Sequence, residues 1–86
     1  MSNRHEEATV NITWQGKNGD LRDTVAFYAS DADILEWADE ALRTGSVQGI
    51  RAKRGASVQG YVVDRFAATG AKPFNRIFIR PKTPFG

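Results

Sequence analysis

Hydrophobic and polar residues alternate along the first part of the chain. In the segment ATVNITWQ, every second residue from Val10 to Trp14 falls on one face of an extended strand. The segment GKNGD follows, and its Asn18-Gly19 pair suits the positive φ angles of a tight turn. LRDTVAFY then predicts a second strand, whose apolar face is interrupted at Asp23 by a bulge or a frayed edge. These patterns predict a β-hairpin.

The segment SDADILEWADEALRTG has the pattern of one amphipathic helix. Ser30 is a suitable N-cap, and Thr44-Gly45 is a usual helix end. Trp37 flanks the apolar stripe and is expected to pack on the sheet, whereas the acids and Arg43 on the opposite face are explained by solvation. The stripe itself recurs at helical spacing: Ile34, Leu35, Ala38, Ala41 and Leu42.

The second half of the chain predicts a long basic loop and then two strands. SVQGIRAKRGAS lacks periodicity and is interpreted as a loop, with one short strand around residues 47–50. VQGYVVDRF predicts a strand in which Gly60 suits a bulge, AATGAKP predicts a turn, and NRIFIR predicts the last strand, which Pro81 and Pro84 end.

This order of elements places one helix across one face of a mixed sheet of four or five strands. The predicted fold class is therefore α+β, a β-grasp-like single domain over residues 1–86. Residues 1–7 are expected to be a flexible start, residues 8–80 the core and residues 81–86 a tail. The first and last strands are expected to lie side by side in the middle of the sheet, because both are rich in apolar residues.

Two segments carry a resemblance to a known family. VNITWQGKNGDLRDTVAFYASDADILEWADEAL resembles the opening of ubiquitin-like proteins, and NRIFIRPKTPFG is similar to their last strand and glycine-terminated tail. The resemblance covers about residues 9–50 and 75–86, and it implies docking through an apolar spot rimmed by basic residues, or activation at Gly86. Residues 51–70 do not follow the family, and the tail ends Phe-Gly where modifiers usually end Gly-Gly.

Composition and charge narrow the class of protein. The chain is 41% hydrophobic and 26% charged, which is typical of a folded globular domain. Residues 1–42 hold three basic and nine acidic residues, net −6, and residues 43–86 hold nine basic and one acidic, net +8. Such a split suits either separate acidic and basic binding faces or two halves that neutralise each other across the fold.

Few side chains are suited to catalysis. His5 is the single histidine and lies in a polar stretch at the start of the sequence. There is no cysteine, so disulfides, thiolate chemistry and Cys-ligated zinc are excluded. GIRAKRG lacks the spacing of a phosphate-binding loop. We therefore expect a protein that is not an enzyme and that uses no cofactor or metal.

Two groups of residues are candidates for binding. In NRIFIR, if the isoleucines meet the helix, a phenylalanine stands between two arginines on the open sheet face, and this composition is typical of protein-binding hot spots. The same side chains could stack on a nucleic-acid base, and the basic loop could reach phosphates. The alternative is that Phe78 is covered by the 51–60 loop or by a second copy. The candidate residues are Arg76, Phe78 and Arg80 on the strand and Arg51, Lys53 and Arg54 in the loop.

Three hypotheses of function follow. The first is a protein–protein interaction module that binds through the open sheet face, a description that also fits a small inhibitor or adaptor from a phage or mobile element. The second is a modifier or sulfur carrier activated at Gly86, which the prolines of PKTPFG would hold extended. The third is a small basic nucleic-acid-binding domain. The start MSNRHEEATV lacks the apolar core of a signal peptide, and no apolar run is long enough to cross a bilayer. We therefore expect a cytoplasmic protein without a membrane partner. The sequence leaves the oligomeric state open.

Overall fold

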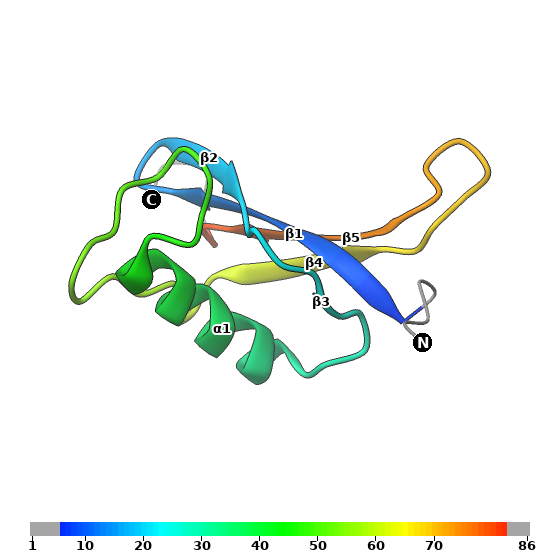
Figure 1. Ribbon diagram of the computed structural model, residues 1–86. Helices are drawn as coiled ribbons and strands as arrows, with labels where there is room; N and C mark the ends of the chain where they lie inside the picture. The colour runs from blue at the N-terminus through cyan, green and yellow to red at the C-terminus, as the bar shows by residue number, and fades with distance from the viewer. Residues whose placement is uncertain (1–5, 83–86) are drawn as a thin grey trace.

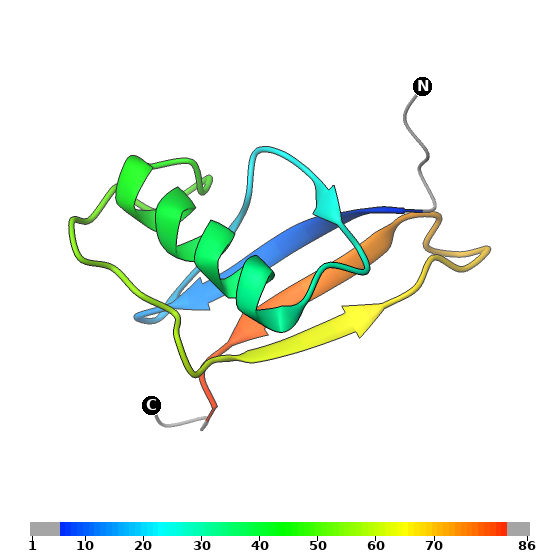
Figure 2. The ribbon, with the colours of Figure 1, turned by 90° about the horizontal axis from the view of Figure 1, so that it is seen from below.

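A mixed five-stranded sheet and one helix form the part of the chain that the structure describes, residues 6–82 of a computed structural model. The helix lies across one face of the sheet, and the other face carries no helix (Figures 1 and 2). This arrangement confirms the predicted α+β class and is compatible with a β-grasp-like fold. The elements are β1 (Glu7–Trp14), β2 (Lys17–Asp20), β3 (Val25–Ala26), α1 (Asp31–Thr44), β4 (Val62–Phe66) and β5 (Asn75–Arg80).

The two most apolar strands pair at the centre of the sheet. The strand order is β2-β1-β5-β4, and β3 pairs with the beginning of β1. β1 and β5 run parallel, with Val10 opposite Ile77, and β4 runs antiparallel to β5. The expectation that the first and last strands lie side by side is therefore met.

The turn of the first hairpin differs from the prediction. Trp14 pairs with Lys17, so the turn residues are Gln15 and Gly16, with φ angles of 50° and 76°. Two positive φ angles are typical of a type I′ turn. The predicted turn residues, Asn18 and Gly19, lie within β2 instead. Contacts between the two strands fix this register, because the amide groups of Asn18 and Asn11 bond each other at 2.7 and 2.9 Å.

The second strand of the hairpin is interrupted, as the position of Asp23 predicted. Residues 21–24 separate β2 from β3, although the Leu21 backbone N–H still donates to Val10 O. The outer edge of β2 is paired with the loop after the helix, because Leu21 bridges Val47 and the Gln48 N–H donates to Asp20 O. The short strand expected around residues 47–50 is reduced to this bridge.

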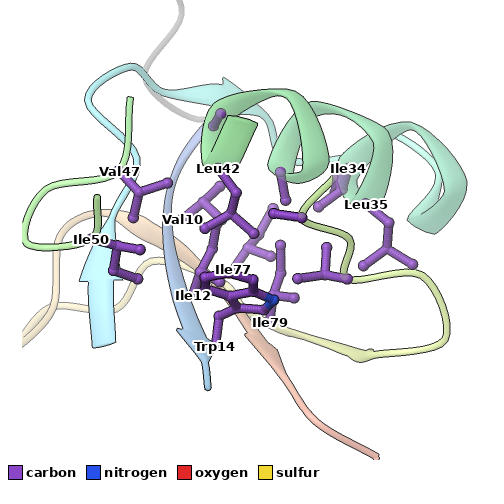
Figure 3. Packing of buried hydrophobic residues seen from close by; sticks show 14 of the residues in the cluster. Val10, Ile12, Trp14, Ile34, Leu35, Leu42, Val47, Ile50, Ile77 and Ile79 are labelled. Carbon is purple, nitrogen blue, oxygen red and sulfur yellow. The ribbon is translucent and has the colours of Figure 1, made fainter. Parts of the chain in front are cut away.

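Helix α1 has the predicted caps and the predicted buried stripe. The Ser30 hydroxyl accepts a hydrogen bond from Asp33 N at 3.1 Å, and Gly45 has a φ of 77° at the C-cap. Figure 3 shows the stripe packed against β1 and β5. The expectation that Trp37 packs on the sheet is wrong. Its side chain is 39% exposed beside residues 21–26, whereas Asp39 is 6% exposed.

The basic loop, residues 46–61, wraps around the end of the helix. Its backbone is fixed at two points, because Lys53 N donates to Leu42 O, and Val58 N donates to the Asp39 carboxylate at 2.6 Å. Gly60 lies in a turn before β4, with a φ of 84°, so the strand begins at Val62. The loop contributes four buried side chains to the core, those of Val47, Ile50, Ala56 and Val58.

Candidate functional site

Strand β5 presents two different faces, as its alternation predicted. Ile77 and Ile79 are fully buried under the helix. Arg76, Phe78 and Arg80 lie on the opposite face of the sheet, which no helix covers (Figure 1). The structure therefore places the three candidate binding residues of this strand on one face, as the sequence predicted.

Strand β4 completes this group with a second phenylalanine. Phe66 lies opposite Arg76 in the antiparallel register, and its ring meets that of Phe78 edge to face at 5.5 Å between centroids. The Arg76 guanidinium lies 5.4 Å from the centre of the Phe66 ring, and that of Arg80 lies 5.7 Å from the Phe78 ring. We call these four residues, Phe66, Arg76, Phe78 and Arg80, the aromatic–arginine cluster. Cation–π and edge-to-face contacts favour this arrangement of its side chains before any partner binds.

The two arginines of the cluster have different surroundings. Arg80 forms an ion pair with Asp64 on β4, with 2.8 Å between Nη2 and Oδ2. Arg76 forms no ion pair within residues 6–82, and its Nε is enclosed without a hydrogen-bond acceptor there. Arg76 is therefore the cation of the cluster whose charge is not already matched by a carboxylate of the described chain.

The β1–β2 side of the same face is polar. Asn11 donates to Asn18 at 2.7 Å and to Asp20 at 2.8 Å, and Asn18 donates to Thr13 at 3.0 Å. These groups satisfy one another, so this side offers a preformed polar border to the cluster.

The basic loop lies elsewhere. Arg51, Lys53 and Arg54 are exposed, but their segment follows the C-terminal end of α1 on the helix side of the sheet (Figure 2). The structure therefore does not join the loop to the aromatic–arginine cluster. Phe78 is partly covered by Phe66 and Arg80 of its own face.

Two further predictions lie outside the described residues. His5 precedes them, and Gly86, the candidate for conjugation, follows them, so the structure says nothing of either. Within residues 6–82, no group of three or more His, Cys, Asp or Glu side chains is arranged to hold a metal ion. In the same range, α1 is neither long nor apolar enough to cross a membrane.

Sequence reasoning missed Phe66 and Asp64. Their alternation with Val62 in VVDRF does place the three on one face of a strand. Their neighbours across the sheet follow only from the register of β4 on β5, which the sequence did not supply. The alternation in VVDRF was visible in the sequence, but the pairing of β4 with β5, which brings Phe66 to Arg76 and Phe78, was not.

No protein-family model, no curated protein and no solved structure matches this chain. The class that can be stated is that of a small α+β domain compatible with a β-grasp-like arrangement. Its function has to be argued from its own surface.

Proposed function

We propose that this protein is a non-catalytic interaction module that binds a protein partner through the open face of its sheet. The observation that supports the proposal is the aromatic–arginine cluster on β4 and β5. Aromatic residues and arginine dominate the binding energy of protein interfaces, most of all where their side chains are held rigid before binding. Here the strands fix the backbone, and the ring and guanidinium contacts favour one arrangement of the side chains.

The charge of this face favours a protein over a nucleic acid. The two arginines of the cluster are accompanied by Asp64 on β4 and Asp20 on β2, so the charges of these four side chains cancel. A face that bound a phosphate backbone would be expected to carry a clear excess of cations. The nucleic-acid hypothesis therefore depends on the separate basic loop at the end of the helix.

The modifier hypothesis depends on Gly86 alone. It predicts that deletion of this residue abolishes function, whereas binding through the open face predicts that the deletion has little effect. The cytoplasmic location expected from the sequence belongs to the same proposal, and fractionation of source cells would check it.

The test is capture from an extract of the source cells with tagged protein. Phe66→Ala and Arg76→Glu should each reduce capture of the partner by about tenfold or more, because loss of a hot-spot side chain costs about 2 kcal/mol or more and about 1.4 kcal/mol already corresponds to tenfold. The matched control changes Arg51, Lys53 and Arg54 together to glutamine, which should leave capture unchanged. Circular dichroism of each variant verifies that the fold is retained.

Three results would contradict the proposal. Capture that survives both cluster variants removes the open face as the site. Bound material that is lost only after nuclease treatment or in the triple loop variant assigns the function to nucleic-acid binding. Heavier bands on a denaturing gel that vanish when Gly86 is deleted identify a covalent modifier.

A further inference from the structure

A pocket of about 490 Å³ lies on the helix side of the molecule, away from the aromatic–arginine cluster. One wall is the extended segment of residues 21–26, and the other is the flank of α1 that carries Trp37, Glu40 and Ala41. The pocket exists because the chain separates from β1 between β2 and β3 and stands beside the helix (Figure 2). The pocket and the cluster share no lining residue.

The apolar part of the pocket contains an exposed tryptophan. Trp37 is 39% exposed, whereas Trp14, the other tryptophan, is 6% exposed in the core. Leu21, Val25 and Ala41 line the pocket with it. Within the described chain, the indole N–H of Trp37 has no hydrogen-bond acceptor, so the helix presents both an aromatic face and a free donor to a ligand.

The charged part of the pocket is acidic. Asp23 lines it from the extended segment and Glu40 from the helix. Neither carboxylate forms an ion pair with any residue between 6 and 82, and Arg22 is the one cation in the lining. An aromatic face with carboxylates beside it is the environment that binds a cation on an apolar stem.

Part of the backbone edge beside the pocket is already paired. Arg22 N donates to Ser46 O, and Gln48 N donates to Asp20 O, so residues 46–48 cover the end of β2 and the start of the extended segment. A peptide strand cannot pair along this part of the edge, whereas a side chain can enter the pocket between the segment and the helix.

We propose that this pocket binds an arginine side chain of a protein partner. The guanidinium group lies between the carboxylates of Asp23 and Glu40, and its plane and methylene stem lie on the indole of Trp37. Arginine fits better than lysine, because its planar group stacks on aromatic rings and donates to two carboxylates at once. The site is independent of the open face, so either can fail without the other.

The test is an NMR titration of ¹⁵N-labelled full-length protein with the peptide acetyl-Ala-Arg-Ala-amide. The neutral control is the same peptide with citrulline, which has nearly the shape of arginine but no charge. We expect saturable shifts of the Trp37 indole N–H and of the amides of residues 21–26 and 40–44 with the arginine peptide alone. The indole signal of the buried Trp14 should not move, and Trp37→Phe identifies which signal is which.

Two matched variants extend the test. Glu40→Gln should weaken binding about threefold, as expected for one partly exposed ion pair. Glu36→Gln, one turn earlier on the exposed surface of the same helix, should leave binding unchanged. The proposal is overturned if no shift saturates, if the citrulline peptide binds equally well, or if the corresponding lysine peptide binds more tightly than the arginine peptide.

Discussion

At Gly19, a carbonyl oxygen from another segment occupies the place where a side chain would begin. A Cβ atom there would overlap Gln48 O and would lie 2.9 Å from Cγ1 of Val47. The sequence had suggested that this glycine serves a turn. Its real reason is the close approach of the loop backbone after the helix, a contact between distant segments that no local pattern contains.

This contact predicts that Gly19→Ala is destabilising. We expect the free energy of unfolding to fall by about 1–3 kcal/mol, the usual cost of overpacking, because the neighbouring atoms are mostly backbone and must shift. Urea unfolding followed by circular dichroism measures the loss. Gly70→Ala is the control, since no atom beyond its two neighbours in the chain lies within 4 Å of the place that a Cβ would take at that exposed glycine. Equal urea midpoints for the two variants would show that the backbone at Gln48 does not approach Gly19 closely enough to exclude a side chain.

Helix α1 shows what its periodicity could and could not predict. The caps and the buried stripe followed from the sequence, because they depend on local chemistry and spacing. Trp37 and Asp39 border that stripe, and hydrophobicity alone would place the tryptophan inside and the carboxylate outside. In the structure Asp39 is buried and Trp37 is exposed. Asp39 faces the loop, where Val58 N–H donates to its carboxylate, whereas Trp37 lines the pocket between the helix and residues 21–26.

The same limit applies to the candidate site. Alternation in β5 correctly predicted that Arg76 and Phe78 share a face. The contribution of Phe66 depends on how β4 pairs with β5, and the separation of the basic loop from the cluster depends on where the loop is anchored. Periodicity predicts which way a side chain points, and only the tertiary arrangement determines its neighbours.

Edge strand β4 is tied to the helix by an arginine that points inward. Arg65 donates from Nη1 to Phe27 O at 2.6 Å and from Nη2 to Asp31 at 2.5 Å, at the beginning of α1. We expect Arg65→Gln to lower the free energy of unfolding by about 1.5–3 kcal/mol, the usual contribution of hydrogen bonds to a charged group. Thermal unfolding measures this. Arg80→Gln, which removes a more exposed arginine (52% against 26% for Arg65) and its ion pair with Asp64, should cost at most about 1 kcal/mol. A larger loss from Arg80 would contradict this assignment.

At the scale of the whole molecule, two connections of irregular structure have opposite roles. Residues 67–74, between β4 and β5, project beyond the sheet and have no side chain in the core (Figure 1). The loop over residues 46–61 contains four core side chains and is held by the buried Asp39 carboxylate. Both segments look alike in sequence, being rich in glycine and small residues.

An insertion should distinguish the two connections. A four-residue insertion, Gly-Ser-Gly-Ser, after Gly70 should lower the free energy of unfolding by less than about 1 kcal/mol, because the entropic cost of closing a loop grows slowly with its length. The same insertion after Gly55 should cost clearly more, since it separates the buried Ala56 and Val58 from the bonds that fix the loop at Lys53. Urea unfolding of both insertion variants provides the comparison, and equal losses would mean that the longer loop is not part of the core.

The parallel pairing of β1 with β5 also has a consequence for the order in which the protein is made. The ribosome completes β1 first among the described elements and β5 last, yet the centre of the sheet needs both. Until Asn75–Arg80 has emerged, Val10 and Ile12 lack their neighbours in β5, and the helix stripe lacks Ile77 and Ile79 beneath it. Contacts between such distant segments form late, so the apolar side chains of the earlier elements stay exposed to solvent until β5 pairs with β1. We therefore expect the described part of the nascent chain to bury its core as one unit, and only after β5 has emerged.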